Sequence, residues 1–169
     1  QTLGHLEQIL RWPAFRDIKD TEDVLLVDEP KTYALIEKMI AVWSGAVRSR
    51  RIHIGMDETH SVGRGCFYDL HGDERHFDIF NRHLNRVVEI CRNHGLQPMI
   101  WSDMYFRMGN LKNDYYDPGT VIPDDVIRAI PEDVGLVYWD YYHDSKAFYA
   151  EWIERHRQLG RVPVMASGV

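Results

Sequence analysis

Asp57 and Glu58 are adjacent carboxylates that directly follow a short run, residues 51–56, in which polar and apolar residues alternate. Alternate residues of this run are apolar, so it is predicted to be a strand that ends at the two acids. Adjacent carboxylates repel each other, and burial raises the pKa of the less solvated one. One acid can then stay protonated while the other stays ionised, as glycoside-cleaving enzymes require. Taken alone, such a pair is most often a solvated turn or a helix N-cap, so the rest of the chain must decide between these and catalysis.

Polar and aromatic residues also lie at the ends of the other predicted strands. They are His5, Trp101, Asp103, Trp139 and Tyr141. The carboxyl ends of parallel strands meet at one face of a barrel, so these residues are expected to gather near the acid pair. Indole and phenol rings can stack on the apolar C–H faces of a sugar, and carboxylates can bind its hydroxyl groups. A tryptophan at a strand end can also be a core residue.

Strand and helix patterns alternate along the whole chain. Strands are predicted at 1–5 (the tail of one), 51–58, 97–103, 136–142 and 162–166, and longer helices at 30–49, 77–93 and 146–159. Short helices are predicted at 6–10 and 123–130, and residues 104–118 are predicted to be irregular and aromatic. Each crossover is long enough to join parallel strands, which predicts an α/β fold. No Gly-rich phosphate loop follows a strand, which favours a (β/α)8 TIM barrel over a doubly wound nucleotide-binding sheet.

Composition narrows the class of protein. The chain has 169 residues, 44% of them hydrophobic, and a formal net charge of -6, which argues against nucleic-acid or membrane-surface binding. No apolar run approaches membrane-spanning length, and no signal peptide opens the chain. The two cysteines do not make a disulfide framework, so a reducing, cytoplasmic location is expected. Neither end resembles a natural terminus, so residues 1–169 are interpreted as part of one barrel domain whose open sheet edges could self-associate.

The residues around the acid pair resemble a known family. Residues 53–58, His-Ile-Gly-Met-Asp-Glu, resemble the His-x-Gly-x-Asp-Glu signature of family 20 glycoside hydrolases, the β-N-acetylhexosaminidases. Residues 2–5 resemble that family's Pro-Gly-His strand end, with Leu3 in place of Pro, and Trp101 and Trp139 match its tryptophan positions. The resemblance covers the whole chain and implies a partial catalytic barrel, from about the third strand towards the seventh.

This resemblance implies retaining, substrate-assisted hydrolysis of β-linked N-acetylhexosamine, without a cofactor or metal. Glu58 would protonate the glycosidic oxygen and then act as the base on water. The acetamido oxygen of the substrate would be the nucleophile, and Asp57 would orient the acetamido N–H. Trp101 and Trp139 would wall the acetamido pocket, and His5 would support the polar network. The expected partners are β-N-acetylhexosaminide glycans, with the choice between GlcNAc and GalNAc left open.

One feature departs from the family pattern. The family usually has a Tyr, with an Asp close by, on a later strand, and the last predicted strand, 162–166, has neither. Tyr141 or Tyr142 could supply the hydroxyl that binds the acetamido oxygen, and Asp103 could contact a sugar hydroxyl. Alternatively, a part of the protein beyond this sequence supplies both groups.

Two other classes of protein remain open at this point. A metal-dependent hydrolase could gather its ligands from acids and histidines near the strand ends, namely Asp57, Glu58, His60, Asp103 and His143. No tight ligand motif such as His-Glu-x-x-His supports that reading. The chain could also be a carbohydrate-binding fragment that lacks the strands needed for turnover.

Overall fold

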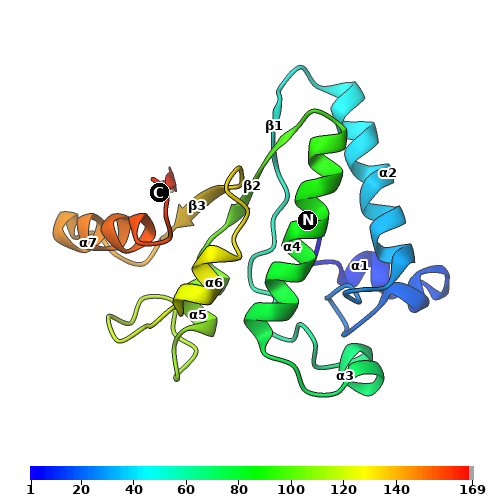
Figure 1. Ribbon diagram of the computed structural model, residues 1–169, viewed down its shortest axis with the longest axis horizontal. Coiled ribbons are helices and arrows are strands. Elements are labelled where there is room, and N and C mark those ends of the chain that lie inside the picture. Colours follow the sequence, from blue (N-terminus) through cyan, green and yellow to red (C-terminus); the bar gives the residue numbers. More distant parts are fainter. Residues whose placement is uncertain (168–169) are drawn as a thin grey trace.

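The computed structural model describes residues 1–167, so the last two residues of the predicted domain 1–169 lie outside the description. Four parallel strands form one sheet in the order β1-β2-β3-β4 (Figure 1). Their bounds are β1 Arg51–His53, β2 Gln97–Trp101, β3 Gly135–Trp139 and β4 Val164–Ala166. In this register Ile100 pairs with Leu136, and both side chains are fully buried.

Helices precede β1 and fill the connections between the strands. They are α1 Glu7–Leu10, a 3-10 helix η1 Pro13–Ile18, α2 Pro30–Ala46, α3 Cys66–His71, α4 His76–Asn93, α5 Asp103–Met108, α6 Asp124–Arg128 and α7 Lys146–Arg157. The spatial order of the strands follows the chain order without the reversal that marks a doubly wound sheet. This sequential parallel order is that of a segment of a (β/α)8 barrel, as predicted.

The two longest helices, α2 and α4, lie side by side and follow directly from local sequence (Figure 1). Pro30 occupies the first turn of α2, where its missing N–H costs nothing, and the Glu29 side chain caps the helix by accepting the Lys31 N–H at 3.0 Å. Apolar residues of α4 recur at helical spacing and are buried: Phe77, Phe80, Leu84, Val87, Val88 and Cys91. The predicted helices at 30–49 and 77–93 are therefore confirmed to within a few residues.

The first predicted strand, residues 1–5, is not a strand in the structure. The Leu3 carbonyl accepts the Leu25 N–H at 2.9 Å, and the Thr2 carbonyl accepts from Nε2 of His83 at 2.9 Å. His5 itself has a left-handed backbone, with φ 55°. Loop and side-chain partners thus replace a strand ladder here, and the sheet has four strands rather than about five.

The four observed strands are also shorter than predicted. β1 ends before the acids because Gly55 and Met56 adopt left-handed φ values of 80° and 74°. β2 ends at Trp101 because α5 begins at Asp103, so the predicted irregular stretch 104–118 opens with a helix. β3 ends at Trp139, where the side chain of the next residue, Asp140, accepts the Tyr142 N–H in a tight turn.

Among residues 1–167, no helix combines the length and the apolar character needed to cross a membrane.

Candidate active site

The acid pair lies on a backbone turn of rare geometry that follows β1. Gly55, Met56 and Glu58 all have left-handed φ values, 80°, 74° and 49°. This conformation costs a non-glycine residue of order 1–3 kcal/mol, so surrounding contacts must hold the turn. Gln1 supplies two of them, because its Oε1 accepts the Met56 N–H at 3.2 Å and its Nε2 donates to Oδ1 of Asp57 at 2.7 Å. A φ of 80° favours glycine at position 55, and a Cβ atom there would also lie 2.0 Å from that Oε1 and displace the Gln1 side chain.

His5 joins the two acids. Its Nε2 lies 3.2 Å from Oδ2 of Asp57 and 3.5 Å from Oε2 of Glu58. The Asp57 side chain is 19% exposed and the Glu58 side chain 39%, so Asp57 is the more enclosed of the two. The structure therefore brings three predicted site residues together, with Asp57 held by two partners and Glu58 open to a ligand.

Asp103 is packed against the same turn and is only 6% exposed. Its Oδ2 accepts the backbone N–H of Glu58 at 3.0 Å. Burial, with a smaller contribution from the negative charge of Asp57, raises the pKa of Asp103 to about 7, although the Glu58 N–H opposes the change. The Trp139 side chain also lowers this pKa, but Oδ1 of Asp103 has no hydrogen-bond partner of acceptable geometry among residues 1–167.

The predicted aromatic residues lie at the ends of β2 and β3. Trp101 packs on the ring of His53, with ring centroids 4.4 Å apart. Trp139 is 9% exposed because tyrosine rings cover it, Tyr141 in a stacked arrangement at 5.7 Å and Tyr115 tilted at 5.7 Å. Tyr141 itself is 57% exposed. Trp139 and Tyr141 therefore form one aromatic surface, of which Tyr141 is the accessible part.

A tyrosine that was not predicted as a site residue, Tyr115, also belongs to this region. Its hydroxyl is hydrogen-bonded to Nε2 of His60, which links the loop after the acid turn to the loop after α5. Burial raises the pKa of Tyr115, and the negative charges of Asp103 and Glu58 raise it further, so the phenol stays neutral. Tyr115 lines a small recess together with Asp103 and Trp139. The only sequence signal for it is the concentration of aromatic residues in 104–118.

The residues of the alternative metal site do not gather around one point. His143 pairs through Nδ1 with Asp140 at 2.8 Å and stacks on Phe148, with centroids 3.6 Å apart. His60 is engaged with Tyr115. In the described part of the chain, no group of three or more His, Cys, Asp or Glu side chains is arranged to hold a metal ion. Within residues 1–167, the structure therefore contains no set of ligands that a metal-dependent hydrolase would need.

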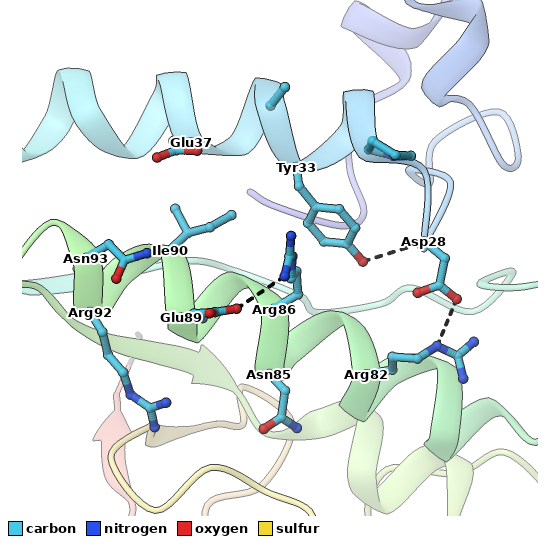
Figure 2. A pocket seen from close by; sticks show the side chains of 12 residues that line it. Asp28, Tyr33, Glu37, Arg82, Asn85, Arg86, Glu89, Ile90, Arg92 and Asn93 are labelled. Carbon is cyan, nitrogen blue, oxygen red and sulfur yellow. Dashed lines mark hydrogen bonds and ion pairs between the residues drawn. The ribbon is translucent and has the colours of Figure 1, made fainter.

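A larger groove, of about 880 Å³, lies between α2 and α4 and contains no residue of the acid turn (Figure 2). Its charged side chains pair with one another, as Arg82 does with Asp28 at 2.8 Å and Arg86 with Glu89 at 3.3 Å (Figure 2). Because these charges are already paired within the groove, the groove is a feature of helix packing rather than a candidate active site.

Comparison with known proteins gives a sequence relative. No model of a known protein family matches the chain. Human hexosaminidase D is 26% identical over 163 residues, a match that covers 85% of this chain and 29% of that protein.

Solved structures share the fold. The GH20 β-N-acetylhexosaminidase of Streptomyces coelicolor A3(2) superposes with a TM-score of 0.50 at 19% identity, over 85% of this chain and 22% of that one. The chitobiase of Flavobacterium johnsoniae superposes with a TM-score of 0.58 at 14% identity, over 98% of this chain and 24% of that one. The GH20 exo-β-N-acetylglucosaminidase of Vibrio harveyi, solved with N-acetylglucosamine, superposes with a TM-score of 0.53 at 15% identity, over 82% of this chain and 18% of that one. The chain is related to the family 20 β-N-acetylhexosaminidases.

The expected resemblance to family 20 and the expected partial TIM barrel are therefore confirmed. The chain spans 29% of the length of hexosaminidase D and similar or smaller shares of the solved structures. Four parallel strands correspond to part of a family 20 barrel, with the acid turn at the carboxyl end of β1. That end of a TIM barrel is where catalytic residues lie.

Proposed function

We propose that the full-length protein containing this segment is a glycoside hydrolase that removes terminal β-linked N-acetylhexosamine from glycans or glycoconjugates. The observation that carries the proposal is the contact of one His5 nitrogen with both Asp57 and Glu58, 3.2 and 3.5 Å away. Two acids beside a single imidazole nitrogen lie on the same side of the site. Both can therefore reach the same sugar ring, one at the glycosidic oxygen and the other at the 2-acetamido group.

Adjacent acids suit a mechanism in which the substrate supplies the nucleophile. Glu58, the more exposed acid, donates its proton to the glycosidic oxygen as the bond from that oxygen to C1 breaks. The carbonyl oxygen of the 2-acetamido group attacks C1 at the same time, and an oxazolinium ion forms. Glu58, now a carboxylate, then takes a proton from the water that attacks C1. Two inversions at C1 give net retention.

Asp57 has the surroundings expected of an orienting group. Gln1 and His5 hold its two carboxylate oxygens, at 2.7 and 3.2 Å, so its position is defined before a ligand binds. A carboxylate in that position accepts the acetamido N–H and stabilises the positive charge that develops on the oxazolinium ring. In this proposal Trp101, at the end of β2, and Trp139, at the end of β3, wall the acetamido pocket, and the hydroxyl of Tyr141 or Tyr115 binds the acetamido oxygen.

The test compares two aryl glycosides as substrates of the full-length protein. Release of nitrophenol from an aryl N-acetyl-β-glucosaminide, with no release from the plain aryl β-glucoside, would support participation of the acetamido group. Equal cleavage of both would point to a protein nucleophile and contradict the proposal. The 169-residue chain is assayed in parallel, because activity confined to the full-length protein would mean that turnover requires parts of the protein beyond this segment.

A further inference from the structure

The Asp103 carboxyl group contacts the main chain of Glu58 rather than an open surface. Its Oδ2 accepts the Glu58 N–H at 3.0 Å, and the residue is 6% exposed. Its Oδ1 has no hydrogen-bond partner among residues 1–167. Within residues 1–167, the hydrogen bond of good geometry that this enclosed carboxyl group accepts comes from the backbone of the proposed general acid.

Asp103 lies at the start of α5, which is hydrogen-bonded to neighbouring elements. It is the first residue of α5, and the preceding residue, Ser102, donates its backbone N–H to the Val137 carbonyl at 3.0 Å. The Ser102 hydroxyl also lies 2.7 Å from Nε2 of the buried His156. These contacts tie the start of α5 to β3 and α7, so the Asp103 carboxyl is held in place independently of the acid turn.

The Glu58 backbone, in contrast, needs support. Its φ of 49° is a conformation that glutamate rarely adopts, and Met56 two residues earlier is left-handed as well. The direction of the Glu58 side chain follows from this backbone conformation. Its N–H group would lose its hydrogen-bond partner in the protein if Asp103 were removed.

We propose that Asp103 is a positioning residue, which holds the Glu58 carboxyl at the angle needed for proton transfer by accepting the Glu58 backbone N–H. This inference rests on the proposed function, in which Glu58 is the general acid. It departs from the expectation that Asp103 binds a sugar hydroxyl, because the hydrogen bond observed is to protein backbone.

The strength of this support depends on pH. The pKa of Asp103 is raised to about 7, so the group changes from carboxylic acid to carboxylate near neutrality, and an ionised acceptor binds an N–H more strongly. Several titratable or charged groups act on this region: Asp57 and Glu58 from the acid turn, His5 from the N-terminal segment, Tyr115 and Tyr116 from the aromatic loop, and His60 and Arg107 beyond Tyr115. Asparagine at position 103 mimics the uncharged form and does not titrate, so it isolates the contribution of Asp103 from theirs.

The experiment measures hydrolysis of an alkyl N-acetyl-β-glucosaminide, whose poor leaving group must be protonated, by the full-length protein and three variants, from about pH 5 to about pH 8. Asp103→Ala is expected to lower kcat at least ~10-fold at every pH while KM stays within about 3-fold, because the support acts on proton transfer rather than on binding. Asp103→Asn is expected to stay within about 3-fold of wild type at pH 5 and to fall about 3- to 10-fold behind it above pH 7. Asp144→Asn, at an exposed position past β3, is the matched control and should follow the wild type throughout.

A wild-type to Asp103→Asn rate ratio that does not change with pH would overturn the inference. So would an Asp103→Ala variant with wild-type kcat. If Asp103→Ala does not fold, the pH dependence of the Asn ratio decides the matter alone, since a purely structural role would not change that ratio. A wild-type protein that cleaves no N-acetyl substrate would overturn the proposed function and this inference together, whereas an active wild type with a flat ratio would overturn the inference only.

Discussion

Nε2 of His5 lies 3.2 Å from Oδ2 of Asp57, which joins the N-terminal segment to the acid turn after β1. The same nitrogen also reaches Glu58. In the full-length protein, His5→Ala should lower kcat for N-acetylglucosaminide hydrolysis at least ~10-fold, or about 1.4 kcal/mol of transition-state stabilisation, because both acids lose the imidazole that they share. His71→Ala, which replaces an exposed histidine of α3, is the control. Equal activity of the two variants would remove His5 from the site.

The acid pair itself can be separated into two roles. Glu58→Gln removes the proton donor and should reduce turnover at least ~100-fold on substrates with poor leaving groups, but much less on nitrophenyl glycosides, whose leaving group needs little protonation. Asp57→Asn should lower the rate on both kinds of substrate, since it removes the charge that stabilises the oxazolinium ion. The measurement is kcat against leaving-group pKa for each variant. A Glu58→Gln variant with the same loss on every leaving group would argue against its role as general acid.

Replacement of Gly55 by alanine is expected to destabilise the protein. Gly55→Ala places a methyl group on a residue with φ 80°, 2.0 Å from the Gln1 Oε1 that binds the Met56 N–H. We expect a loss of about 1–3 kcal/mol in the free energy of unfolding, from backbone strain and the displaced Gln1 side chain. Gly45→Ala is the control, because nothing lies within 4 Å of a Cβ atom there and alanine favours the α2 helix by about 0.5–1 kcal/mol. Urea unfolding of both variants tests whether their effects have opposite sign.

Asp20 holds the loop that follows the acid turn. Its carboxylate accepts the backbone N–H groups of Gly63, Gly65 and Phe67 at 2.7, 3.1 and 2.8 Å, and the residue is 4% exposed. Burial raises the pKa of Asp20, and these three hydrogen bonds oppose the change. Asp20→Ala leaves three donors without their acceptor, so unfolding free energy should fall by about 3 kcal/mol or more.

Asp20→Asn should lose less, because the amide keeps one oxygen acceptor. Replacement of the exposed Asp69 by alanine should change stability by less than about 0.5 kcal/mol. An Asp20→Ala variant as stable as the Asp69→Ala variant would contradict this account of the loop.

His156 predicts a pH dependence of stability. Burial lowers its pKa to about 4, and the Trp152 carbonyl, 2.6 Å from Nδ1, opposes the change. In the unfolded chain the histidine pKa is about 6.5, so as pH falls from 6.5 to 4 the unfolded state takes up a proton that the folded state does not. The contribution of neutral His156 is therefore complete above pH 6.5 and falls by about 2 kcal/mol at pH 5.

His156→Gln removes this term, since glutamine does not titrate. The difference in unfolding free energy between wild type and variant should shrink by about 2 kcal/mol between pH 7 and pH 5. Taking the difference between the two proteins cancels the contributions of other groups. These include His83, whose pKa is also lowered to about 4, and Asp103, whose raised pKa makes its contribution decrease as pH rises from about 4 to 7. A pH-independent difference would show that His156 is not a buried neutral base.

The sequence by itself determined the parallel α/β architecture and the place of the acid pair. Helices α2 and α4 were predictable because a helix repeats its buried positions every three or four residues, and their caps and first-turn proline are local. Asp57 and Glu58 were predictable as the last residues of a strand pattern, which places them at the catalytic end of a barrel. The lack of a Gly-rich phosphate loop after any strand favoured a barrel over a nucleotide-binding sheet, and the sequential strand order of the structure agrees with it.

Only the tertiary structure decided how the site residues contact one another. The left-handed turn from Gly55 to Glu58 is stabilised by Gln1 and Asp103, which lie far from it in the chain, so no local pattern reveals it. The pairing of His60 with Tyr115, and the covering of Trp139 by tyrosines, likewise arise between separate loops. Periodicity reports which face of an element is buried, whereas a hydrogen bond depends on the distance and angle between atoms that only the packed chain brings together.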